Sequence, residues 1–68
     1  MELTIKSEQE SDGRWLAEVK ELPGAMTYGR TRLEAISRAQ ALALRVLADQ
    51  VENQETQTES LTVPFNAA

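Results

Sequence analysis

The segment from Leu22 to Ala35 constrains the fold more than any other part of this 68-residue chain. Two glycines and a proline bracket residues 25–28, which leaves room there for one short strand only. Thr31 is a natural N-cap, and the carboxylate of Glu34 can reach back to the amide of the cap, as in a capping box. The segment therefore predicts a Pro-Gly turn, a short strand ended by Gly29 and the start of a helix. None of its residues predicts catalysis.

Two more strands are predicted ahead of this segment, because apolar and polar residues alternate over residues 1–6 and again over residues 14–22. Polar residues 8–13 separate them and end in Asp12-Gly13, a dipeptide favoured in hairpin turns. Together with residues 25–28, these strands are expected to form an antiparallel meander, since neighbouring strands are then joined by short connections.

A helix is predicted over residues 32–51, which contain neither glycine nor proline and are rich in Ala, Leu and Arg. A polar linker is expected over residues 52–60, followed by a last strand over residues 61–65. A right-handed crossover would place this strand beside the first and parallel to it. Because Pro64 has no N–H to donate, the strand is expected either to be an edge or to meet solvent or a neighbouring chain there. The expected fold is a single α+β domain over residues 1–68, in the order β-β-β-α-β.

The predicted helix carries more apolar surface than one small sheet needs, because its apolar side chains span an arc of about 200°. The excess predicts contact with a second subunit or a partner, since large exposed apolar patches usually mark interfaces. A small chain without disulfides also commonly gains stability by oligomerising, so a homo-oligomer (dimer or tetramer) is expected. The alternative is that the alanines simply allow close approach to the sheet. The residues assigned to this interface are Leu33, Leu44, Leu47, Val51 and Phe65.

Residue types that carry chemistry are scarce in this chain. It contains no His and no Cys, so neither an activated nucleophile nor a conventional zinc site is expected. A two-metal site needs carboxylates that converge from central strands, and the last predicted strand contains no acidic residue. The sequence therefore predicts no enzymatic activity, no metal and no cofactor.

The charge balance favours a protein partner over nucleic acid. Eleven acidic and seven basic residues give a net charge of −4, whereas binding to phosphates depends on clustered Lys and Arg. Direct DNA binding is not expected, and an acidic surface suits a basic partner protein, with Glu18 and Glu21 as the partner-facing candidates. No segment approaches the ~20 apolar residues of a membrane span and no signal peptide is visible, so a cytoplasmic protein is expected.

Several short motifs are similar to those of the HicB-like antitoxin family. They are Gly13 and Trp15 at a strand start, the turn at residues 21–24, Gly29 with Thr31 before the helix, and the pair Glu34-Ala35. The resemblance covers roughly residues 1–51. It implies a partly degraded RNase H-like fold without nuclease activity, in a short form that has no DNA-binding domain.

The same resemblance implies a partner, because members of this family bind and neutralise HicA, a small basic toxin that cleaves mRNA. The expected function is therefore that of a non-catalytic domain that neutralises such a toxin by direct contact. The alternative is an orphan, homo-oligomeric small domain with a structural or ligand-binding role.

Overall fold

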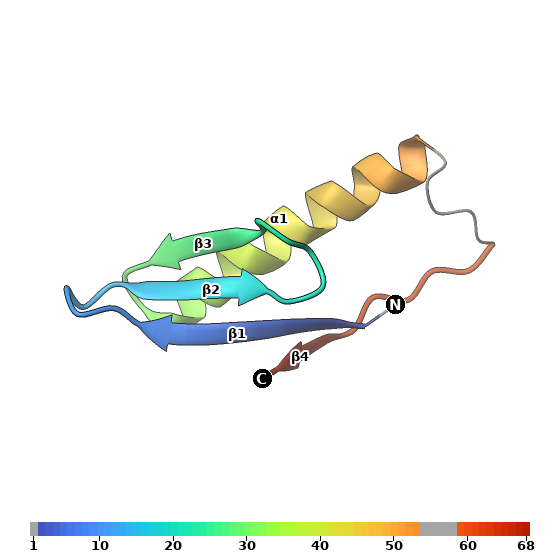
Figure 1. Cartoon of the computed structure of the whole chain (residues 1–68). Helices are drawn as coiled ribbons and strands as arrows, with labels where there is room; N and C mark the ends of the chain where they lie inside the picture. The colour runs from blue at the N-terminus through green and yellow to red at the C-terminus, as the bar shows by residue number, and fades with distance from the viewer. Residues whose placement is uncertain (1, 54–58) are drawn as a thin grey trace.

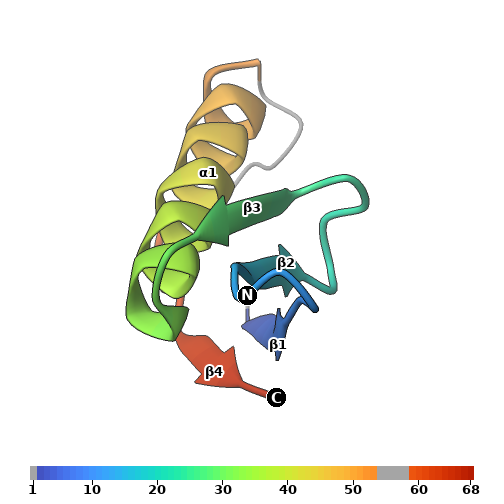
Figure 2. The same ribbon diagram turned by 90° about the vertical axis from the view of Figure 1, so that its left-hand side faces the viewer.

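The computed structural model describes residues 2–53 and 59–68 as one four-stranded sheet with one helix. The sheet order is β3-β2-β1-β4, and α1 packs across one face of the sheet and leaves the other face open (Figures 1 and 2). The predicted α+β class and the order β-β-β-α-β are confirmed. The elements are β1 (Leu3–Gln9), β2 (Trp15–Val19), β3 (Met26–Gly29), α1 (Arg32–Glu52) and β4 (Phe65–Ala67).

The first three strands form the predicted antiparallel meander. The strand β1 runs three residues further than predicted, because the Glu10 N–H donates to the Arg14 carbonyl (2.7 Å) and keeps the hairpin paired up to its turn. Gly13 has a positive φ of 92° in that turn, as a hairpin glycine should. The strand β2 ends at Val19 rather than Leu22, since the Leu22 N–H already turns back to the Val19 carbonyl (3.1 Å).

The predicted Pro-Gly turn is confirmed. The Ala25 N–H donates to the Leu22 carbonyl (2.9 Å), and Gly24 has a φ of +85°. Proline followed by a glycine with positive φ is the arrangement of a type II turn. The predicted end of this strand at Gly29 is confirmed, although Gly29 itself belongs to β3 and its φ is not positive. A Cβ atom at Gly29 would lie 2.5 Å from the Ala35 nitrogen, so this glycine permits close approach of the helix.

The helix begins as predicted, with one difference in the cap. The Thr31 hydroxyl oxygen accepts from the Glu34 N–H (3.0 Å), which confirms the N-cap. The Glu34 carboxylate accepts from the Arg30 N–H (3.1 Å), one residue before the amide that the capping box predicts. Glu34 also pairs with Arg38 (3.4 Å), as its spacing of four residues favours.

Alanines at every fourth position form the buried face of α1, together with Leu47. Small side chains let the helix axis approach the sheet closely, so this part of the apolar arc is explained by packing within the chain. The sheet contributes Leu3, Ile5, Ala17 and Val19 to the same core. The helix contributes Ala35, Ala39, Ala43 and Leu47.

The last strand pairs with its own chain, parallel to β1, with Leu3 opposite Phe65. It covers Phe65–Ala67 rather than the predicted 61–65, and Pro64 precedes it as an acceptor for the Leu3 N–H (3.1 Å). The helix continues to Glu52, so the predicted linker starts later than expected, and its residues 54–58 lie outside the described part of the chain.

Candidate interaction surfaces

The helix is longer than the sheet that it covers. At 1.5 Å per residue, its 21 residues span about 31 Å, whereas the five residues of β2 span about 17 Å. The last buried residue of α1 is Leu47, and the turns beyond it extend past the strands (Figure 1). Apolar side chains on these turns therefore have no sheet beneath them.

One side of this extension is an apolar groove of about 540 Å³, which we call the overhang groove. Leu61 and Val63, which precede β4, line this groove together with the helix. Leu44, Val51 and Leu61 are 50%, 44% and 46% exposed there, which is unusual for aliphatic side chains gathered in one place. The lining residues are Leu44, Leu47, Ala48, Val51, Glu52, Leu61 and Val63.

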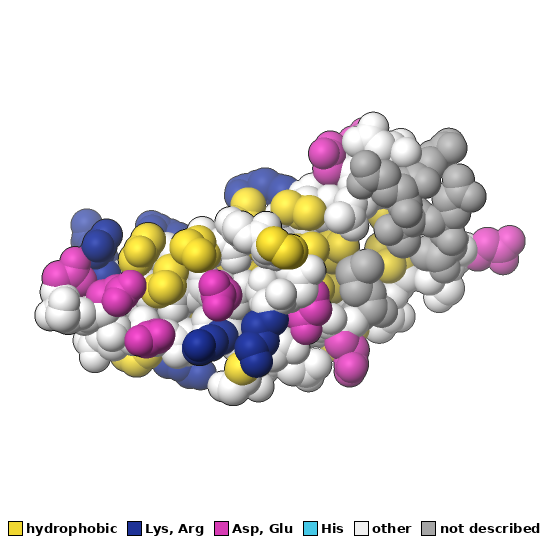
Figure 3. Space-filling model, viewed as in Figure 1, with side chains coloured by type: hydrophobic (Ala, Val, Ile, Leu, Met, Phe, Trp, Pro, Cys, Tyr) yellow, Lys and Arg dark blue, Asp and Glu magenta, His cyan; other side chains and the backbone are white. Residues whose placement is uncertain are grey.

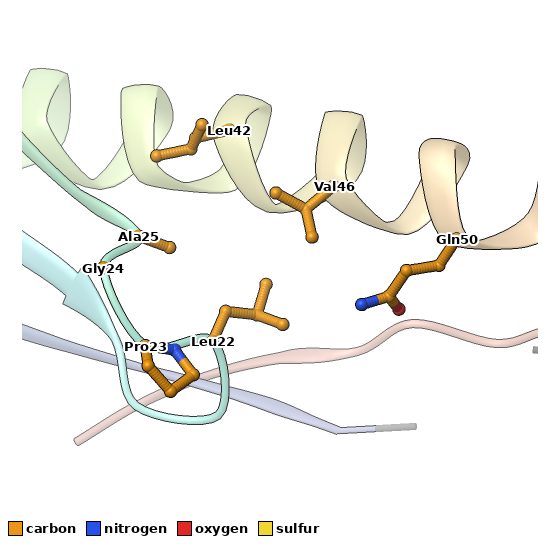
Figure 4. Close-up of a pocket in the computed structure, with 7 residues that line it drawn as sticks. All are labelled: Leu22, Pro23, Gly24, Ala25, Leu42, Val46 and Gln50. Atoms are coloured by element: carbon orange, nitrogen blue, oxygen red, sulfur yellow. The ribbon is translucent and has the colours of Figure 1, made fainter. Parts of the chain in front are cut away.

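A second hollow, of about 340 Å³, lies between α1 and the turn that joins β2 to β3 (Figure 4). Leu42, Val46 and Gln50 project from successive turns of the helix toward Leu22 and Pro23. These helix positions differ from those of the overhang groove, and the row of buried alanines runs between the two sets. The apolar arc of the helix is therefore wider than the sheet can cover, as predicted.

The open face of the sheet mixes apolar and charged side chains (Figure 3). Leu16 lies opposite Tyr28 in the β2–β3 ladder, and the Arg14 guanidinium stacks over the Tyr28 ring, 4.5 Å from its centroid. Glu18 lies opposite Lys6 of β1, a cross-strand arrangement in which opposite charges stabilise the sheet. This face offers both signs of charge rather than one acidic surface.

Glu21, the second acidic candidate, is exposed but already engaged. Its carboxylate accepts hydrogen bonds from the backbone N–H and the hydroxyl of Thr4, at 2.6 and 2.8 Å. These bonds, the backbone one above all, hold the pKa of Glu21 below its ordinary value. Of the two acidic candidates, Glu18 is therefore the one without such a tie to the fold.

The five predicted interface residues do not form one surface. Leu44, Leu47 and Val51 come together in the overhang groove, although Leu47 is only 4% exposed and belongs to the core. Leu33 is 73% exposed in the first turn of α1, and Phe65 lies on β4, beside a different hollow.

Four residues of the overhang groove were not predicted as interface residues: Ala48, Glu52, Leu61 and Val63. Leu61 and Val63 are the two that lie outside the helix. Their alternation with polar residues predicted a strand there instead. The apolar character of both positions is the signal that could have placed them against the helix.

In residues 2–53 and 59–68, no three His, Cys, Asp or Glu side chains gather as a metal site would require. Over the same ranges, no helix combines the length and the apolar character needed to cross a bilayer. Comparison with protein-family models, with curated proteins and with solved structures finds no match for this chain.

Proposed function

We propose that this chain is a non-catalytic protein-binding domain, with a degenerate RNase H-like fold, that acts like a HicB-type antitoxin. In this role it neutralises a small, basic, mRNA-cleaving toxin in the cytoplasm by direct contact. The overhang groove is the observation that carries the proposal. Exposed aliphatic side chains of this kind, gathered in one concave surface, are typical of sites that bind another protein.

The surroundings of the groove fit a basic partner. Leu44, Val51 and Leu61 supply the apolar contacts, and Glu52 is the one charged residue among those that line the groove. The whole chain carries a net charge of −4, so a basic protein would be attracted to it over a distance. Glu18 is the better of the two acidic candidates for a further contact, because Glu21 already accepts two hydrogen bonds.

Co-expression with the protein encoded by the neighbouring reading frame tests this proposal. We expect that protein to be basic, to arrest growth when produced alone, and to co-purify with this chain in a complex that restores growth. Leu44→Glu should abolish both the complex and the rescue, because it places a charge in the apolar groove.

Leu33→Glu is the matched control, since Leu33 is also an exposed leucine of α1 but lies outside the overhang groove. It should leave the complex intact. Growth that is arrested equally with and without this chain, or a complex that tolerates Leu44→Glu, would contradict the proposal.

The second candidate function is that of an orphan homo-oligomeric domain. The feature that favours it is the outer edge of β4, which lies apart from the overhang groove.

A further inference from the structure

The two edges of the sheet differ in how they are covered. At the β3 edge, Arg38 reaches over from α1 and its Nη1 donates to the Tyr28 carbonyl (2.9 Å), so the helix occupies a backbone acceptor there. At the opposite edge, no element of the described chain lies beyond β4. The sheet therefore has one blocked edge and one open edge.

Backbone groups of β4 point alternately toward β1 and away from it. The Pro64 carbonyl accepts from the Leu3 N–H (3.1 Å), and the Ala68 N–H donates to the Ile5 carbonyl (3.0 Å). Successive residues of a strand direct their backbone groups to opposite sides, so Asn66 also faces β1, whereas Phe65 and Ala67 face outward. The N–H and C=O groups of both outward residues are therefore available to form hydrogen bonds with another strand.

This edge lacks the usual protection against such pairing. Proteins commonly protect exposed edges with charged side chains, especially Lys, or with proline. Residues 60–68 contain no charged residue. Pro64 does not protect the edge, because its backbone faces β1. The N–H that proline lacks is therefore absent on the side of β1 and not on the outer edge.

We infer that β4 pairs with β4 of a second copy of this chain, antiparallel and about a two-fold axis, to form one continuous sheet. Asn66 lies opposite Asn66 of the second copy, and Phe65 of each chain lies opposite Ala67 of the other. Each Phe65–Ala67 pair then exchanges both of its N–H···O bonds, so every outward backbone group of β4 is used.

The side chains agree with this register. Phe65 and Ala67 share the helix-facing side of the sheet with Leu3 and Ile5, so each aromatic ring would meet a small methyl group across the axis. Beside Ala67 lies a hollow of about 170 Å³ that can receive the ring of the second copy. Its lining residues are Ile5, Ile36, Gln40, Phe65, Asn66 and Ala67.

Other symmetric registers use these features less well. Centring the pairing on Phe65 would set two rings directly opposite each other and leave Ala67 facing Val63, a residue that packs against the core of its own chain. Centring it on Ala67 would leave Phe65 without an opposite residue in β4. The inference concerns self-association alone and does not depend on the proposed toxin-binding function.

Disulfide trapping tests both the dimer and its register. The chain has no native cysteine, so single replacements are unambiguous. The two Asn66 residues form a non-hydrogen-bonded pair, because the backbone groups of each face its own β1. Directly opposite residues of such a pair have Cα atoms about 4.5 Å apart, within disulfide reach. Asn66→Cys should therefore form a covalent dimer under mild oxidation. Ala67→Cys and the distant Ser11→Cys should form far less.

Light scattering on the wild-type chain supplies the second measurement. We expect a mass of about 15 kDa, twice the 7.6 kDa of one chain. Ala67→Pro removes an outward N–H at both symmetric positions and adds a ring there, so it should weaken the dimer at least about tenfold, while circular dichroism stays unchanged. A wild-type chain that stays monomeric at millimolar concentration, or an oligomer that tolerates Ala67→Pro, would overturn the inference.

Discussion

Glu21 and Thr4 are 17 positions apart in the chain, yet the Glu21 carboxylate accepts from both the backbone N–H and the hydroxyl of Thr4. The pair fastens the start of the β2–β3 turn to β1. This tie explains the lowered pKa of Glu21, because both donors stabilise the charged carboxylate. It also makes the stability of the fold depend on pH at this position.

Glu21→Gln should reduce the loss of stability in acid. A carboxyl group whose pKa is lowered in the folded state stabilises the fold at pH values above its ordinary pKa of 4.5. This contribution is lost as the pH falls through the folded-state pKa. The glutamine variant should therefore be less stable than the wild type at pH 7 but close to it at pH 3. Urea unfolding at several pH values measures this difference.

Glu8→Gln serves as the control for that experiment. Glu8 is exposed on β1 and its side chain forms no hydrogen bond or ion pair with other described residues, and the replacement removes the same charge. If both variants showed the same pH dependence, net charge rather than the Thr4 contact would be responsible.

Gly29→Ala should be more damaging than Gly13→Ala, although each replacement adds a single methyl group. The new Cβ would lie 2.5 Å from the Ala35 nitrogen, and neither backbone can yield without moving α1 off the sheet. We expect a loss of about 3 kcal/mol, at the upper end for overpacking. Gly13→Ala meets nothing within 4 Å and should cost about 1–2 kcal/mol through its positive φ alone. Thermal unfolding that ranks Gly13→Ala as the worse variant would refute this account of Gly29.

The alanines of α1 should not tolerate larger side chains. Ala39 is fully buried between helix and sheet, so Ala39→Leu should cost about 2 kcal/mol as the helix is forced outward. Ala48→Leu is the matched change at an exposed position of the same helix and should stay within about 0.5 kcal/mol of the wild type. Equal unfolding midpoints for the two variants would show that the helix does not depend on close approach.

Truncation of two nearby leucines should show, by the loss of stability, which one belongs to the core and which one only lines the overhang groove. Leu47→Ala removes a side chain that is 4% exposed and should cost about 2–4 kcal/mol, whereas Leu44 is 50% exposed and Leu44→Ala should cost less than about 1 kcal/mol. Chemical unfolding of both variants measures the difference. Comparable losses would mean that the groove is part of the core in solution.

The elements that follow from local rules could be predicted from the sequence. Pro23-Gly24 and the pair Thr31–Glu34 act over three or four residues, so the turn and the helix start are confirmed at the predicted positions. Period-two alternation over residues 1–6 and 14–22 places Leu3 with Ile5, and Ala17 with Val19, on one face of each strand. These four residues are the sheet side of the core.

The remaining features depend on contacts between distant segments. Leu44 and Leu47 are both apolar and lie on the same arc of the helix. Leu47 is buried because it continues the row at every fourth position that faces the sheet, whereas Leu44 lies beside that row. Gly29 resembles a strand breaker in the sequence, because the Ala35 backbone that it must accommodate belongs to another element. The last strand begins at Phe65 rather than at residue 61 for a similar reason, because its position is set by pairing with β1.

The placement of β1 between β2 and β4 has a consequence for the order of folding. The β1–β2 hairpin closes over a short loop, whereas Leu3 meets Phe65 only after nearly the whole chain has been brought together, which is slow. We therefore expect β4 to dock last and, by local unfolding, to leave first, with fast amide hydrogen exchange at Asn66 and Ala68. A second strand paired with β4 would stabilise the docked position of β4 on β1. Slower exchange at these two amides would therefore report on dimer formation.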